Sequence, residues 1–96
     1  MKYRAVRLAR LVDANPKWTA NADRGPESYL QFDCPIHEDC DGILIPVNPP
    51  VPQGWKREGK DFDDMTLTPS IAKRGEGCKV HMYVTNGAFN VLADSR

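Results

Sequence analysis

All three cysteines and both histidines of the 96-residue chain fall in two short segments. The first is Cys34-Pro-Ile-His37-Glu-Asp-Cys40, and the second is Cys78-Lys-Val-His81. Thiolate sulfur and imidazole nitrogen are ligands that suit zinc, and four of them close a tetrahedral structural site. The two segments therefore predict one structural Zn²⁺ ion that joins the two halves of the chain.

The residue types leave two ligand sets open. The first assignment is Cys34, Cys40, Cys78 and His81, which uses every thiol. The alternative pairs two Cys-x-x-His units, with His37 as the competing ligand and Cys40 as a free thiol. Structural zinc contributes about 10–16 kcal/mol in peptide hosts, which is comparable to the whole stability of a small domain. We therefore expect metal binding to decide whether the chain folds.

Motifs of known catalytic chemistry are lacking, so the sequence assigns no catalytic residue. It contains no HExxH, no HxE with a later PCxxC, no GxSxG and no phosphate-binding glycine loop. Glu38 and Asp39 flank His37, but they are expected to face solvent on a turn. Ser70 has no partner histidine outside the predicted metal site. The sequence favours a protein that is not an enzyme, and a zinc-dependent hydrolase is the least favoured alternative.

The charge balance argues against a dedicated nucleic-acid module, because the 13 basic residues are balanced by 13 acidic residues. The first twelve residues nevertheless carry four positive charges, Lys2, Arg4, Arg7 and Arg10, and no negative one. These four residues keep nucleic-acid binding as an alternative function. No signal peptide and no apolar run long enough to span a membrane are recognised, so we expect a cytoplasmic protein. In a reducing compartment, thiols favour metal over disulfide.

The expected fold is one mostly β domain over residues 1–96, with a small α+β fold as the alternative. It divides into an N-terminal strand and loop, 1–27, and a core, 28–92. About five or six short strands are expected, at 2–12, 28–32, 42–47, 65–68, 80–85 and 88–92. The first of them also fits one face of a helix.

Turn residues set the limits of these strands. Residues 13–26 are expected to form a loop, and residues 73–77 another. Pro69 is expected to end the strand at 65–68, because it cannot donate a backbone hydrogen bond. Asn86-Gly87 predicts a tight hairpin between the last two strands, since both residues tolerate positive φ.

The stretch Met65-Thr-Leu-Thr-Pro-Ser-Ile71, followed by Cys78-x-x-His81 and the Asn86-Gly87 turn, resembles a family of small zinc-binding phage and bacterial proteins of uncharacterised function. Its members carry a (T/S)-x-(T/S)-P-S-(I/V) hallmark and an upstream Cys-Pro cluster, which Cys34-Pro35 matches. The resemblance covers residues 28–92. His37 departs from it, because some relatives have a cysteine there. The resemblance implies a zinc-binding β domain and supplies no reaction.

Together these features predict a non-catalytic, zinc-stabilised binding or adaptor protein from a phage or mobile element. It would act by protein–protein interaction, on a partner such as a host protein. No residue in the pattern selects that partner or specifies an oligomeric state.

Overall fold

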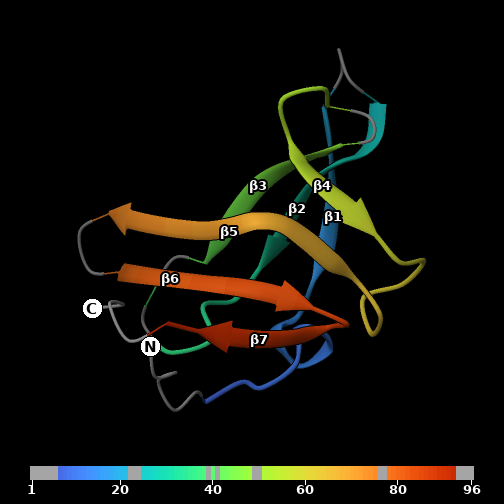
Figure 1. Ribbon diagram of the computed structural model, residues 1–96. Coiled ribbons are helices and arrows are strands. Elements are labelled where there is room, and N and C mark those ends of the chain that lie inside the picture. Colours follow the sequence, from blue (N-terminus) through green and yellow to red (C-terminus); the bar gives the residue numbers. More distant parts are fainter. Residues whose placement is uncertain are drawn as a thin grey trace.

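The computed structural model describes residues 7–21, 25–38, 40, 42–48, 51–75 and 78–92. A short 3-10 helix, η1 (Leu11–Ala14), precedes seven strands. The strands are β1 (Lys17–Asn21), β2 (Gly25–Phe32), β3 (Ile43–Asn48), β4 (Trp55–Glu58), β5 (Thr66–Gly75), β6 (Cys78–Thr85) and β7 (Ala88–Val91). They form one sheet in sequence order (Figure 1).

The sheet is mixed. Every neighbouring pair is antiparallel except β3 and β4, which are parallel and pair only through Val47 with Trp55 and Asn48 with Lys56. The predicted mostly β class is confirmed, and the described residues form seven strands where five or six are expected. No helix in the described part of the chain is long and apolar enough to cross a membrane.

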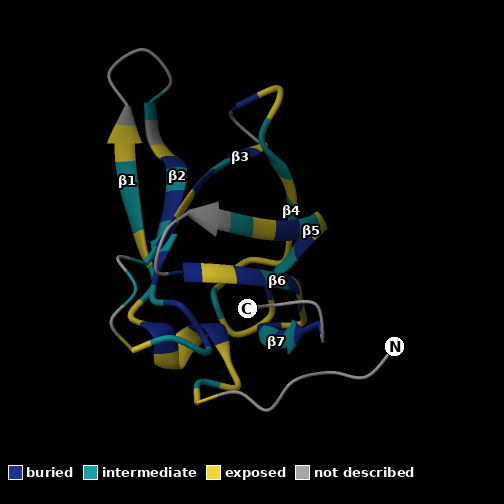
Figure 2. Cartoon of the chain, turned by 90° about the vertical axis from the view of Figure 1, so that its left-hand side faces the viewer, coloured by how far each residue is buried: buried dark blue, intermediate teal, exposed yellow. Residues whose placement is uncertain are grey.

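The apolar core lies between two halves of this sheet. Strands β1–β3 cross strands β5–β7 at a steep angle (Figure 1). Side chains alternate between the two faces of a strand, so every second residue points into the core. Figure 2 shows this alternation on β6, where Cys78, Val80, Met82 and Val84 are buried and their neighbours are more exposed. Ile43, Ile45 and Val47 do the same on β3.

The Asn86-Gly87 hairpin is confirmed. Thr85 pairs with Ala88, and the two turn residues have φ of 49° and 75°. A two-residue turn with two positive φ values matches the right-handed twist of the flanking strands. Gly87 also lies against another segment: its N–H donates to the Met65 carbonyl at 2.8 Å, and a Cβ there would collide with the carbonyl of Asp63.

The prediction for the N-terminal part is wrong in the described residues. Residues 7–12 form no named strand; Arg10 makes only an isolated bridge to Ala88 before η1 begins. Residues 1–6 of the expected strand lie outside the described residues. Strand β1 instead lies inside the expected loop at 13–26, where Trp18 pairs with Leu30 of β2. Pairing with β2 outweighs the local turn signals on either side of it.

The predicted end of a strand at Pro69 is also wrong. Strand β5 continues to Gly75, through part of the loop expected at 73–77. Leu67 pairs with Val84 and Ile71 with Met82, so β5 has extra residues in a bulge between these pairs. A proline in a bulge removes no ladder hydrogen bond, and the strand can therefore pass through it. The Thr68–Pro69 peptide bond is cis.

Candidate functional site: a serine–histidine pair beside a cysteine cluster

A serine and a histidine on neighbouring strands are in hydrogen-bond contact. The Oγ atom of Ser70 on β5 lies 2.9 Å from the Nε2 atom of His81 on β6. Both residues are half-buried, so the pair is neither sealed in the core nor fully solvated. A hydroxyl within hydrogen-bond reach of an imidazole nitrogen is the arrangement of a serine nucleophile and its general base.

The register of β5 and β6 explains why these two side chains meet. Ala72 pairs directly with His81, and Ser70 is two residues before Ala72 on the same strand. Diagonal neighbours across an antiparallel pair are within reach of long side chains. Ser70 belongs to the bulge after Leu67, and a bulge re-aims the side chains that it contains.

The backbone carbonyl of each member of the pair accepts a hydrogen bond from a neighbouring segment. The indole N–H of Trp55, at the start of β4, donates to the Ser70 carbonyl at 3.3 Å. The N–H of Leu92 donates to the His81 carbonyl at 2.8 Å. The backbone of each member is thereby fixed to an adjacent strand or strand end, which limits how far the two side chains can move apart.

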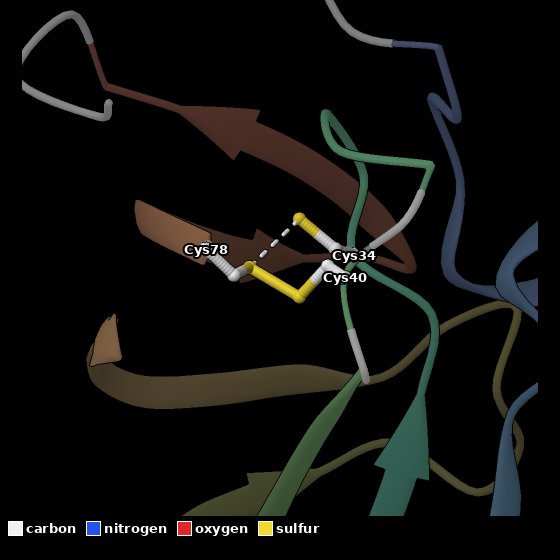
Figure 3. A group of neighbouring side chains, drawn as sticks. All are labelled: Cys34, Cys40 and Cys78. Carbon is white, nitrogen blue, oxygen red and sulfur yellow. Dashed lines mark hydrogen bonds between the residues drawn. A yellow bond between two sulfur atoms is a disulfide. The ribbon is translucent and has the colours of Figure 1, made fainter. Parts of the chain in front are cut away.

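The three cysteines gather at a different place. Their sulfur atoms all lie within 4.8 Å of one another, and Figure 3 shows that they come from both halves of the chain. Cys34 and Cys78 are buried with their sulfurs 3.6 Å apart, while Cys40 and Cys78 are joined as a disulfide. Such a group of sulfurs can bind a metal ion as well as form a disulfide.

His37 borders this cluster. Its Nδ1 atom lies 3.5 Å from the Cys34 sulfur, and its backbone N–H donates to the same sulfur at 3.4 Å. The Lys73 ammonium lies 3.7 Å from the Cys40 sulfur. An N–H donor and an ammonium are contacts that a thiolate accepts, and the thiolate is the form of cysteine that binds metal.

The structure brings together the three predicted cysteine ligands but places the fourth, His81, elsewhere. Residues three apart on a strand project to opposite faces, so His81 points away from the face that carries Cys78. The ring of His81 contacts Ser70, while the ring of His37 contacts Cys34. Binding of a metal by His81 remains a prediction; of the two histidines, His37 is the one whose ring contacts a cysteine sulfur.

The basic N-terminal residues that are described serve as internal contacts. The Arg7 guanidinium donates to the carbonyls of Cys34 and His37, at 3.0 and 3.3 Å. The Arg10 guanidinium donates to the carbonyls of Asp63 and Asn86, at 2.8 and 3.2 Å. Lys2 and Arg4, the other two members of the predicted nucleic-acid surface, lie outside the described residues.

The comparisons with known proteins give one match. The model of a family described as "Bacterial ubiquitination-like system serine protease (BubE)" matches residues 10–92. No curated protein and no solved structure matches significantly.

This match corrects the predicted function. A non-catalytic adaptor is wrong, because the family is described as a protease, and the alternative of a nucleic-acid module is not favoured either. The prediction assigned His81 to the metal and therefore considered no partner for Ser70, which contacts His81 in the structure. Of the resemblance to phage and bacterial zinc proteins, the bacterial family is confirmed, whereas phage origin and zinc remain predictions. Because the match covers most of its length, the chain belongs to the BubE family, the serine protease of a bacterial ubiquitination-like system.

Proposed function

We propose that this protein is a serine hydrolase that cleaves an amide bond in a polypeptide. Ser70 is the nucleophile and His81 is the general base. The observation that carries this proposal is the 2.9 Å contact between the Ser70 hydroxyl and Nε2 of His81. The description of its family as a serine protease supports the same chemistry.

The geometry suits acylation of the serine. With Nε2 unprotonated, His81 accepts the hydroxyl proton while Ser70 Oγ attacks the carbonyl carbon of the scissile bond. The resulting tetrahedral intermediate collapses when the imidazolium returns this proton to the leaving nitrogen. The bond from carbon to nitrogen breaks, the amine product leaves, and Ser70 carries the acyl group as an ester.

Deacylation uses the same two residues in the same roles. His81 takes a proton from a water molecule, whose oxygen attacks the ester carbon. The imidazolium then protonates Ser70 Oγ as the ester bond breaks. The products are a carboxylic acid and the regenerated pair. Half-burial of both residues allows a polypeptide and water to reach them from the outer face of β5 and β6.

The substrate class follows from the family rather than from the geometry. The family is described as belonging to a bacterial ubiquitination-like system. We therefore propose a protein component of such a system, or a conjugate formed by it, as the natural substrate.

A small phosphonyl fluoride tests the proposal without knowledge of that substrate. An activated serine displaces fluoride from phosphorus and forms a stable phosphonyl ester, whose mass locates the modified residue. We expect labelling at Ser70, and a loss of at least about 10³-fold in rate in Ser70→Ala and His81→Ala. Thr85→Ala, at an exposed position on β6, is the matched control and should label as the wild type does. Undiminished labelling of Ser70→Ala would contradict the proposal.

The cysteine cluster supports a second, structural role. We propose that Cys34, Cys40 and Cys78, when reduced, hold one Zn²⁺ ion with His37 as the fourth ligand. The donor set fits, because three sulfurs within 4.8 Å and an imidazole 3.5 Å from one of them have the ligand types and number of a closed tetrahedral site. When bound, the ion supplies a cross-link between the segments that carry Cys34 and Cys40 and the start of β6. The serine–histidine pair faces away from it.

Metal analysis of reduced protein tests this role. About one zinc per chain is expected in protein purified under reducing conditions, together with loss of free thiols on metal loading. A reduced, folded chain that binds no zinc would contradict it.

A further inference from the structure

We infer that a groove between β3 and β5 is the binding site for the residues of the polypeptide substrate that flank the scissile bond. The occupant is an extended peptide segment that pairs its backbone with the edge of β5 and places a bulky apolar side chain against Leu44 and Trp55. This inference rests on the proposed function, because it names how the substrate reaches Ser70.

The groove exists because β4 is too short to fill the space between its neighbours. Strand β4 pairs with β3 only through Val47 and Asn48, and its pairing with β5 ends at Thr68. The segments 43–46 of β3 and 71–73 of β5 therefore each have one edge that no described strand pairs with. Both segments line the same cavity, which has a volume of about 490 Å³.

Unpaired strand edges are binding sites for extended peptides. Backbone N–H and C=O groups along such an edge can add one further strand, and pockets beside it select alternate side chains. A cavity of about 490 Å³ is larger than one side chain needs and lies in the range of ligand sites. The groove is therefore suited to a short peptide segment rather than to a single residue.

The walls of the groove favour an apolar side chain. Leu44 and Trp55 line it, together with Ile71 and Ala72. Leu44 is 59% exposed, so its side chain is accessible to a peptide in the groove. Among the described residues that line the groove, the single charge is that of Lys73, whose ammonium donates to the Gly42 carbonyl. None of the described residues that line the groove carries a carboxylate, so a basic side chain has no partner among them.

The groove adjoins the serine–histidine pair, although neither Ser70 nor His81 is among its lining residues. Ile71 and Ala72 directly follow Ser70 on β5, and Ala72 is the residue that pairs with His81. Trp55 lines the groove and donates its indole N–H to the Ser70 carbonyl. A peptide paired with this edge would therefore have its carbonyl groups next to the nucleophile, as an attack by Ser70 requires.

Cleavage of a mixed peptide library tests the inference. Peptides from a digested proteome are incubated with the protein, and new ends are identified by mass spectrometry. For the wild type, we expect a bulky apolar residue at one fixed position, next to the scissile bond or one residue further. Leu44→Glu should lower kcat/KM at least tenfold for the best peptide. Leu44→Lys should shift the preference at that position toward acidic residues.

Val12→Glu and Val12→Lys are matched controls, because Val12 is 43% exposed and lies outside the groove. Both should keep the wild-type cleavage pattern. Phosphonyl fluoride labelling of each variant shows separately whether its serine–histidine pair is assembled. A lack of labelling in the wild type would contradict the proposed function itself.

Three results would instead overturn only the groove. The first is labelling of the wild type without cleavage of any library peptide. The second is a cleavage pattern that both Leu44 variants leave unchanged. The third is loss of labelling in both Leu44 variants, since an exposed side chain that only contacts substrate should leave the pair intact.

Discussion

Cys78 and His81 stand on opposite faces of β6. The sulfur of Cys78 is buried against Cys34, whereas the ring of His81 contacts the hydroxyl of Ser70. The Cys-x-x-His segment is thus divided between two sites, because an odd spacing on a strand turns the second side chain to the other face. Metal binding and serine reactivity should therefore be separable by mutation.

His81→Ala and His37→Ala should have opposite effects. His81→Ala is expected to keep the zinc content of the reduced protein and to abolish phosphonyl fluoride labelling. His37→Ala is expected to lower zinc affinity about 10-fold or more, because it removes one of the four proposed zinc ligands. It is expected to retain labelling in the folded fraction. Zinc-to-protein ratio and labelling are measured on the same samples. Loss of zinc in His81→Ala with full retention in His37→Ala would support the ligand set first predicted from the sequence.

Cys78→Ala should destabilise the fold. This change removes the sulfur that connects β6 to Cys34 and Cys40, whether the connection is metal or disulfide. We expect a decrease of about 2–5 kcal/mol in the free energy of unfolding, measured by denaturant titration. Thr85→Ala, on the same strand, should lie within about 0.5 kcal/mol of the wild type. A Cys78→Ala protein as stable as this control would show that the sulfurs contribute no cross-link.

Trp55→Phe should slow the reaction of Ser70 without unfolding the protein. Phenylalanine keeps most of the apolar ring but loses the N–H that donates to the Ser70 carbonyl. Loss of one neutral hydrogen bond costs about 1 kcal/mol, which corresponds to roughly fivefold in the labelling rate. Trp18→Phe is the control, because it makes the same replacement at a tryptophan whose ring stacks on Phe62. Equal rates in the two variants would show that the Trp55 contact has no part in positioning the nucleophile.

Gly87→Val should lower the melting temperature. The residue has φ of 75°, and its Cβ would meet the Asp63 carbonyl, so both the backbone and the packing oppose a β-branched side chain. We expect the free energy of unfolding to decrease by about 1–3 kcal/mol. Each kcal/mol lowers the melting temperature of a domain of this size by about 4–8 °C. Asn86→Gly at the other turn position, where φ is 49°, should change stability far less. A melting curve identical to that of the wild type would place the strain elsewhere.

Local signals in the sequence were sufficient to predict part of the fold. Two-residue alternation and the Asn86-Gly87 turn gave the final hairpin, because both depend on residues that are adjacent along the chain. Strand β1 was missed because its pairing with β2, not its own composition, makes it a strand. Strand β5 was shortened because a proline ends a ladder only where its missing N–H is needed.

The cysteine cluster was predictable from the sequence, since soft donors in two tight groups have few reasons to occur together. The strand pairing of β5 with β6, and the bulge that re-aims Ser70, decided that this serine meets His81. Residue types and spacing therefore determined which atoms could do chemistry in this protein. Only the tertiary structure decided which of them share a face, because strand register and bulges are set by contacts between segments far apart along the chain.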